Sequence, residues 1–352
     1  MEKSIYFKKL LDLKKQMMKI ENTPYTMWVK VIVLTTVNMK YEKVAFDKAI
    51  NEHPYVLVEK ILHGAQVLLD NLLDISFIES NDREVKIFKS KVREEKHHDL
   101  FNEMWDRFDD LDFQRYIERY VYRIKINSIY NLVYNKSCVD LGGGNGAFCF
   151  ALLKSGAKKV VGIDFGEKSI EYASKKAQEL GFSTKHALFK VRSCYETKCD
   201  SNSFDFAIQN GVFHHLDDED RAIKEAARIL KVGGWFWYYT AGEGGIGYDL
   251  WAASVEMLQD VPILFIENVL LSMNVSRNKI IHLTDGLSAT YRHTSWDKIT
   301  KKLESYGFGN FRRLKGGFET DFDYDRIESD PYGKEKFGEG DLRVLTQLIH
   351  KK

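Results

Sequence analysis

Residues 139–146 of this chain read Val139-Asp140-Leu141-Gly142-Gly143-Gly144-Asn145-Gly146. An apolar strand ends in this stretch, and a tight glycine turn opens the next helix. Glycine allows positive φ and lets a ligand approach without a Cβ in the way. Such a turn at the carboxyl end of a strand lies where doubly wound sheets bind their ligands.

The chain around this turn alternates between apolar strands and amphipathic helices, which predicts a largely parallel sheet. The expected strands are residues 137–141, 159–164, 187–191, 204–209 and 235–239, and the expected helices are 147–155, 167–180, 218–230 and 296–306. Two further strands, 311–314 and 344–349, are expected to form an antiparallel pair. The predicted fold class is therefore α/β, with a doubly wound, Rossmann-like, mainly parallel sheet and an antiparallel last strand.

The flanks of the predicted sheet have helical spacing. The chain has 352 residues, more than one core normally serves. We expect a helical N-terminal domain over residues 1–111, and a second domain over 112–352 with a helical insertion at about 248–293. Helix starts are expected at Asn22-Thr23-Pro24 and His53-Pro54, because proline favours the first helical turn. Residues 112–134 are expected to form one long helix.

Composition excludes several classes of partner. The 52 lysines and arginines nearly balance the 51 aspartates and glutamates, which gives no electrostatic case for a nucleic-acid partner. No run is apolar enough to span a bilayer, and the N-terminus does not resemble a signal peptide. The four scattered cysteines indicate reduced thiols in a cytoplasmic protein and no metal site.

Asp140 distinguishes two interpretations of the glycine turn. Gly142, Gly144 and Ala147 alone also fit the G-x-G-x-x-A dinucleotide pattern. With Asp140, the stretch resembles the D-x-G-x-G-x-G loop of class I S-adenosylmethionine-dependent methyltransferases. In that family the turn holds the amino acid part of the cofactor, whose ammonium group suits a carboxylate. The resemblance implies S-adenosylmethionine as cofactor, held by Asp140, Gly142, Gly143, Gly144 and Gly146.

Four later segments extend the resemblance over about residues 136–239. Asp164 ends the second strand about 20 residues past the glycines, where an acid binds ribose hydroxyls, and Phe165 is placed to lie against adenine. Ser193 and Cys194 stand in the family's adenine segment, although Ser193 replaces the usual acid. Asn210 and Gly211 follow the fourth strand, in the loop that faces cofactor and acceptor. Leu230-Lys231-Val232-Gly233-Gly234 is similar to the family's L-K-P-G-G turn, with Val232 in place of proline.

The resemblance implies in-line methyl transfer, which a positioned base assists when the acceptor is a hydroxyl. His214, His215 and His293 are the candidate catalytic residues by type, although such histidines also commonly pack or cap a turn. Aromatic rings could line the acceptor site and face the sulfonium group. The candidates for this role are Tyr116, Tyr120, Tyr239, Tyr248 and Tyr291.

The acceptor is not identified by these residues, and several alternatives remain open. We expect a small-molecule acceptor, roofed by the N-terminal helices and the insertion. The segment from Glu95 to Trp105, which contains His97-His98, resembles one that precedes the catalytic domain in some small-molecule methyltransferases. An RNA or protein methyltransferase and a non-catalytic cofactor-binding subunit are the alternatives. Asp140 and the Gly233-Gly234 turn disfavour an oxidoreductase, and the apolar insertion is compatible with a homodimer.

Overall fold

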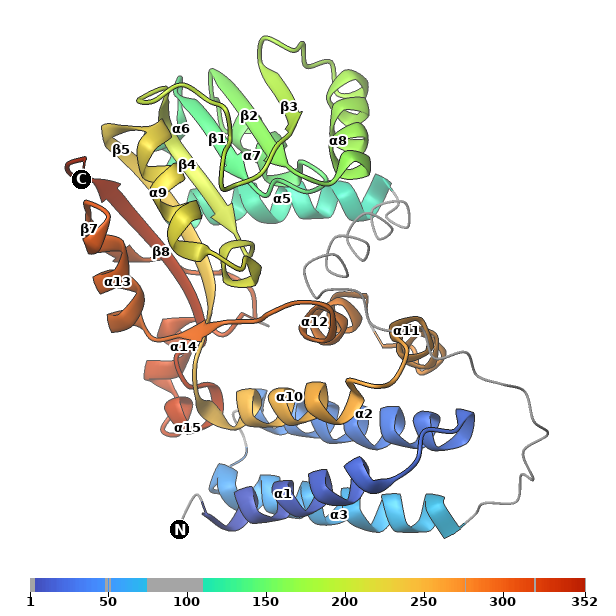
Figure 1. Cartoon of the computed structure of the whole chain (residues 1–352). Helices are drawn as coiled ribbons and strands as arrows, with labels where there is room; N and C mark the ends of the chain where they lie inside the picture. The colour runs from blue at the N-terminus through green and yellow to red at the C-terminus, as the bar shows by residue number, and fades with distance from the viewer. Residues whose placement is uncertain are drawn as a thin grey trace. The chain divides into compact units, whose positions relative to one another are not determined.

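The structure, a computed structural model, consists of two compact units (Figure 1). It describes residues 4–47, 50, 52–74, 110–275, 277–319 and 321–351. Within these, the sheet unit comprises residues 110–243, 290–326 and 339–351, and the helical unit comprises 4–74, 244–289 and 327–338. The segment with His97 and His98 lies outside the described residues.

The sheet unit is built on one mixed sheet in the order β3-β2-β1-β4-β5-β8-β7. Its strands are β1 (Ser137–Leu141), β2 (Lys159–Asp164), β3 (Ala187–Val191), β4 (Phe204–Asn210), β5 (Leu230–Gly242), β6 (His293–Thr294), β7 (Phe308–Arg313) and β8 (Asp341–Leu348). β8 runs antiparallel to both of its neighbours, β5 and β7, whereas β1 to β5 are parallel. The predicted fold class is confirmed.

Side chains of the parallel strands alternate between two apolar layers, because successive strand residues point to opposite faces. One layer holds Val139 and packs under α9 (Glu219–Ile229) and α13 (Trp296–Ser305). The other holds Cys138 and packs under four helices: α5 (Asp110–Ile126), α6 (Tyr130–Val133), α7 (Ala147–Lys154) and α8 (Glu167–Glu179). This alternation directs Asp140, Asp164, Asn210 and Tyr239 toward the face that α5 and α7 cover.

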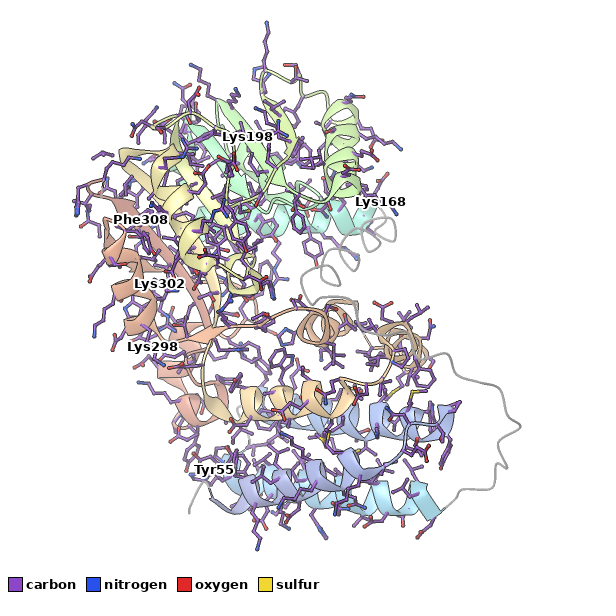
Figure 2. All side chains as sticks on the ribbon, in the orientation of Figure 1. Tyr55, Lys168, Lys198, Lys298, Lys302 and Phe308 are labelled. Atoms are coloured by element: carbon purple, nitrogen blue, oxygen red, sulfur yellow. The ribbon has the colours of Figure 1, made fainter. Side chains whose placement is uncertain are left out.

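Lysine side chains of α13 connect this helix to the rest of the sheet unit. Figure 2 labels Lys298 and Lys302, which lie one helical turn apart. Lys298 pairs with Glu243 at 2.7 Å and Lys302 pairs with Glu219 at 2.7 Å. Exposed pairs of this kind stabilise little, so the apolar layer, and not these lysines, holds α13 in place.

The expectation of one long helix over residues 112–134 is wrong, because the structure has two helices there. α5 ends at Ile126, and α6 begins at Tyr130. Ser128 adopts a left-handed φ of 54°, which interrupts the helix without a glycine. Nδ2 of Asn127 donates to the carbonyl oxygen of Arg123 at 2.9 Å and so satisfies one of the last helical carbonyls. Nothing in the sequence signals this break, because serine and asparagine are not strong helix breakers.

The helical unit is formed by three stretches that are distant in sequence. Its helices are α1 (Ser4–Lys19), α2 (Pro24–Phe46), α3 (Pro54–Asp74), α10 (Gly245–Leu258), α11 (Ile263–Ser272), α12 (Arg277–Ser288) and α15 (Gly333–Phe337); α14 (Tyr324–Ser329) lies where the chain enters the third stretch. The expected helix starts at Pro24 and Pro54 are confirmed, and Thr23 caps α2 through the amide of Thr26. None of the described helices combines the length and apolarity needed to cross a membrane.

Hydrogen bonds between distant residues join these stretches within the helical unit. The Tyr6 hydroxyl of α1 donates to Asp249 of α10 at 2.6 Å. Nδ2 of Asn38 on α2 donates to the Ser254 hydroxyl at 2.8 Å. The helices that follow the fifth strand therefore pack with the first helices of the chain, whereas the sequence suggests a boundary at residue 111. The expected domain boundaries stay a prediction.

Replacing Gly162 by alanine should destabilise the sheet unit. A Cβ at this β2 position would lie 2.5 Å from Cδ1 of Phe189, which is far inside van der Waals contact. Overpacking of a core costs about 1–3 kcal/mol, and denaturant-induced unfolding would measure this loss. The matched control is Gly64→Ala in α3, where a Cβ meets open space. Alanine favours helices, so that variant should be slightly more stable; a Gly162→Ala variant of native stability would contradict the packing described.

Candidate active site

The glycine turn between β1 and α7 is held by the end of β2. Gly142, Gly144 and Gly146 have φ of 84°, 49° and 80°, which favours glycine at each position. The amides of Gly142 and Gly143 donate to the carbonyl oxygen of Ile163 at 2.7 and 3.0 Å. A Cβ on Gly142 would lie 2.4 Å from a methyl carbon of Val212. The turn is thus closely packed between the second strand and the loop after the fourth.

Asp164 connects the turn to the start of α8. Its Oδ2 accepts a hydrogen bond from the Gly144 amide at 2.9 Å, and its Oδ1 accepts one from the Gly166 amide at 2.8 Å. Burial raises the pKa of Asp164, and these amide hydrogen bonds oppose the rise. The Phe165 amide also bonds to this carboxylate and lowers its pKa. The neighbouring Phe165 is 41% exposed.

Asp140 lies beneath the turn and is only 2% exposed. Its Oδ2 accepts a hydrogen bond from Sγ of Cys149 at 3.4 Å. Burial raises the pKa of Asp140 to about 7; the thiol hydrogen bond lowers it, and the nearby Asp164 raises it further. A cation at this place would favour the carboxylate form of Asp140.

The other residues expected at the cofactor lie on two loops. The Ser193 hydroxyl accepts from the Tyr195 amide at 3.1 Å. Cys194 is buried in the apolar layer beneath α9. A Cβ on Gly211 would lie 3.3 Å from the ring of Tyr239, and Nδ2 of Asn210 donates to the Tyr120 hydroxyl at 3.4 Å. The structure therefore brings Asn210, Gly211, Tyr120 and Tyr239 together at the carboxyl ends of β4 and β5.

Gln209 shapes this loop, although the sequence analysis did not single it out. Its Nε2 donates to the carbonyl oxygen of Tyr239 at 2.8 Å, and its Oε1 accepts from the amides of Val212 and Phe213. Asn145 was also missed. Its Oδ1 accepts from the Ala147 amide at 3.1 Å, and its buried Nδ2 has no hydrogen-bond partner within the described residues. Its position inside the glycine turn was the available signal.

The histidine candidates gather around Tyr291. His214 and His215 lie in the short helix η2 (Phe213–His215), which follows β4. The Tyr291 ring stacks on His214 at 4.7 Å and on His293 at 4.9 Å, and the edge of His215 approaches it at 4.7 Å between centroids. Nδ1 of His215 lies 2.9 Å from the carbonyl oxygen of Thr290. Because a carbonyl only accepts, Nδ1 carries the hydrogen, and Nε2 of the neutral ring holds the basic lone pair.

The tyrosine candidates fall into different environments. Tyr239 approaches His214 with 6.3 Å between ring centroids, and Tyr120 stacks on Phe148 at 4.2 Å. Tyr116 packs against the apolar layer under α5. Tyr248 belongs to α10 of the helical unit, where its ring stacks on Trp251. The sheet unit thus holds four of the five expected tyrosines.

Among the described residues, no group of three or more metal-ligating side chains is placed to hold a metal ion.

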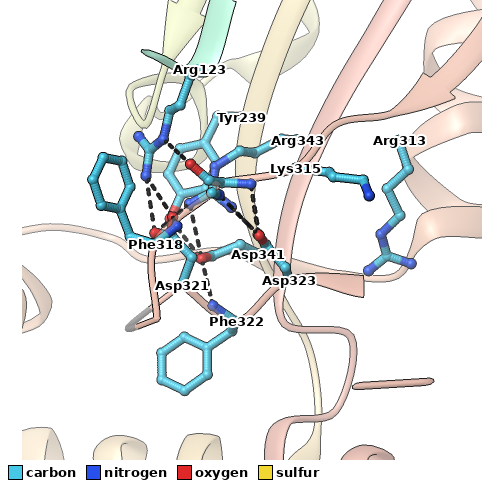
Figure 3. Close-up of polar contacts among 12 residues, drawn as sticks. Arg123, Tyr239, Arg313, Lys315, Phe318, Asp321, Phe322, Asp323, Asp341 and Arg343 are labelled. Atoms are coloured by element: carbon cyan, nitrogen blue, oxygen red, sulfur yellow. Dashed lines mark hydrogen bonds and ion pairs between the residues drawn. The ribbon is translucent and has the colours of Figure 1, made fainter. Parts of the chain in front are cut away.

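A buried cluster of arginines and aspartates contacts Tyr239 (Figure 3). Asp321 accepts hydrogen bonds from Arg119 at 3.0 Å, Arg123 at 2.9 Å and Arg343 at 3.2 Å. Asp341 accepts from Arg343 and from the Tyr239 hydroxyl, both at 2.9 Å. This cluster was not predicted from the sequence. The one local indication of it is a charged residue, Arg343, among the apolar residues of β8.

Removing one charge from this cluster should be costly. In Asp321→Asn the guanidinium groups of Arg123 and Arg343 lose the carboxylate that they share while remaining buried. Breaking a buried pair by removing one partner costs about 3–5 kcal/mol, so the denaturant midpoint should fall strongly. Asp325→Asn is the matched control, because Asp325 pairs with Lys315 at the surface and its loss should leave the midpoint nearly unchanged. Equal effects of the two substitutions would contradict this account.

Comparison with known proteins finds a family that matches the segment containing the glycine turn. Residues 139–238 match a family described as a methyltransferase domain. Arsenite methyltransferase from Mus musculus is 30% identical over 109 residues, which cover 28% of this chain and 29% of that protein. The match thus spans less than a third of the mouse protein.

Two further matches extend beyond that segment. Ubiquinone biosynthesis O-methyltransferase from Pelagibacter ubique is 26% identical over 228 residues, which cover 60% of this chain and 92% of that protein. The solved structure of a Burkholderia thailandensis 1,6-didemethyltoxoflavin-N1-methyltransferase is 14% identical to this chain, with a TM-score of 0.44 over 74% of this chain and 92% of that chain.

Proposed function

We propose that this chain, whose residues 139–238 form a class I S-adenosylmethionine-dependent methyltransferase domain, transfers the methyl group of S-adenosylmethionine to a small-molecule acceptor. One observation carries the proposal. The glycine turn after β1 is fastened to Asp164 at the end of β2, and the carboxyl group of Asp140 lies beneath it. The proposal takes Asp164 as the acid for the ribose hydroxyls and Asp140 as the acid for the ammonium group, and the position of both at one turn supports it.

The residues present fit this cofactor. The turn has the positive φ angles that keep side chains away from a ligand. Asp164, at the end of β2 beside this turn, is an acceptor that a ribose hydroxyl can donate to. Nδ2 of Asn145 and Oδ1 of Asn210 are buried without a hydrogen-bond partner in the described part of the chain. Such atoms are costly unless a ligand or water pairs with them, which supports a polar ligand beside the turn.

When bound, S-adenosylmethionine supplies a methyl group already activated by a sulfonium. The chain then needs to hold an acceptor atom in line with that methyl group, and positioning of this kind can supply much of the rate. We assign the acceptor side to Tyr120, Asn210, Tyr239 and the histidines around Tyr291. His215 is the favoured base: its Nδ1 bonds to the Thr290 carbonyl oxygen, so Nε2 is the nitrogen that would accept a proton.

A small-molecule acceptor is favoured for two reasons. The Pelagibacter ubique relative, whose name refers to ubiquinone biosynthesis, is matched over 92% of its length. The chain has a net charge of only +1, which provides no attraction for a nucleic acid. A protein acceptor remains the alternative. The homodimer stays a proposal.

Asp164→Ala should weaken binding of the cofactor by about 10-fold to 100-fold, because hydrogen bonds to a charged group are worth about 1.5–3 kcal/mol. Calorimetric titration with S-adenosylmethionine and S-adenosylhomocysteine measures this, with NAD as a negative control. Asp200→Ala is the matched variant, since Asp200 is exposed on a loop and should bind normally. Binding of NAD alone by the native chain would reject the function. Release of S-adenosylhomocysteine with a panel of metabolites then tests transfer itself.

Cofactor binding should depend on pH through Asp140. The pKa of Asp140 is raised to about 7, so the carboxyl is largely neutral below this pH and charged above it. Affinity for S-adenosylhomocysteine should therefore rise between pH 5.5 and pH 7, and fall again at higher pH, where the ligand's own α-amino group loses its proton. Asp140→Asn should bind weakly and without the rise between pH 5.5 and pH 7. A flat profile in the native chain would remove the ammonium assignment from Asp140.

A further inference from the structure

We propose that Cys149 is a positioning residue of this site, whose thiol orients the carboxyl group of Asp140 beneath the glycine turn for the cofactor's ammonium group. The proposal rests on the proposed function. Sγ of Cys149 donates to Oδ2 of Asp140 at 3.4 Å. Oδ1 of Asp140 accepts no hydrogen bond from the described residues, which leaves that oxygen for a ligand. The thiol therefore selects which carboxyl oxygen remains available.

The backbone dictates that these two side chains meet. Asp140 shares its face of β1 with Cys138, and this is the face that α7 covers. Cys149 is the third residue of α7, so its thiol returns toward the end of the strand that precedes the turn. The hydrogen bond consequently joins the two ends of the glycine turn. Gly162 on β2 makes room for the sulfur, because a Cβ there would lie 3.2 Å from Sγ.

The thiol is suited to be a fixed donor. Burial raises the pKa of Cys149 well above its usual range, so the sulfur keeps its hydrogen throughout the working pH range. An S–H group is a weak donor, and it only partly offsets the desolvation of the Asp140 carboxylate. Losing it would leave a buried carboxylate with less support, and such a group resists ionisation.

Other titratable groups also face Asp140. Asp164 on β2 disfavours the charge on Asp140 by repulsion. Tyr120 on α5 and Cys194 after β3 also interact electrostatically with Asp140, and burial raises the pKa of both, so both stay neutral near pH 7. Cys149 is thus the group in this set that supports the carboxylate form of Asp140, which is the form an ammonium group needs.

The test compares Cys149→Ala and Cys149→Ser in the full chain with two probes. S-adenosylhomocysteine carries the ammonium group, and 5′-methylthioadenosine has the nucleoside and sulfur without the amino acid part. Cys149→Ala should bind S-adenosylhomocysteine about tenfold more weakly at pH 7, the size expected for losing one hydrogen bond to a charged group, and its pH profile should shift upward. Binding of 5′-methylthioadenosine should be unchanged. Cys149→Ser should restore much of the native profile, because a hydroxyl also donates.

Cys199→Ala is the matched control, since the Cys199 thiol donates to the Thr197 carbonyl and not to Asp140; it should bind both probes normally. Equal weakening of both probes by Cys149→Ala would mean that Cys149 only supports packing, and a native pH profile would mean that it has no role. Either result would overturn the proposal about Cys149. The proposed function would still stand in both cases, provided that the native chain binds S-adenosylhomocysteine. Failure of the native chain to bind S-adenosylhomocysteine would overturn both.

Infrared spectroscopy tests the hydrogen bond without any ligand. The S–H stretching band that disappears in Cys149→Ala reports the Cys149 thiol, and its frequency depends on the acceptor. Asp140→Asn should shift this band, because an amide oxygen is a weaker acceptor than a partly ionised carboxyl group. An unshifted band would overturn the pairing itself, whatever the outcome of the binding experiments.

Discussion

The organisation of the candidate site depends on the hydrogen bonds that the Asp164 carboxylate accepts from backbone amides. A turn with three glycines at positive φ has few side chains of its own to define its shape, and glycine loses more entropy on ordering than any other residue. Asp164 offsets part of that cost by accepting from the amides of Gly144 and Gly166. The strand that delivers Asp164 is paired in register with β1. The sheet thus sets the shape of the loop, and the loop in turn defines where a ligand can lie.

A second constraint comes from the alternation of strand side chains. Since neighbouring residues point to opposite faces, each strand of the sheet can present only every second residue to the face under α5 and α7. Asp140, Asp164, Asn210 and Tyr239 all occupy such positions near the carboxyl ends of their strands. A shift of one residue in any strand would move its polar residue into the layer beneath α9. The apolar residues between them therefore fix the site as much as the polar residues do.

The local structure around the glycine turn could be predicted because it is continuous in sequence, and the cofactor-binding roles of its residues stay a prediction. Residues 137–166 contain β1, the turn, α7, β2 and Asp164, so pattern and spacing describe them together. The fold class followed from the same periodicity. The break at Ser128 could not be predicted, since a left-handed serine has no distinctive sequence pattern. The roles of Gln209, Asn145 and Cys149 were missed because they depend on which atoms meet after folding, and not on spacing along the chain.

The acceptor half is assembled from distant parts, and this explains why the sequence does not identify the acceptor. Tyr239 is hydrogen-bonded to Asp341, which pairs with Arg343, whose guanidinium shares Asp321 with Arg123 on α5. A buried cluster of this kind requires each charge to find its partners, because a missing partner leaves an uncompensated ion. The chain therefore fixes the Tyr239 side of the site through pairs more than 100 residues apart. The glycine turn and Asp164 lie in one continuous segment, whereas the residues that we propose for the acceptor side are brought together only by the tertiary structure.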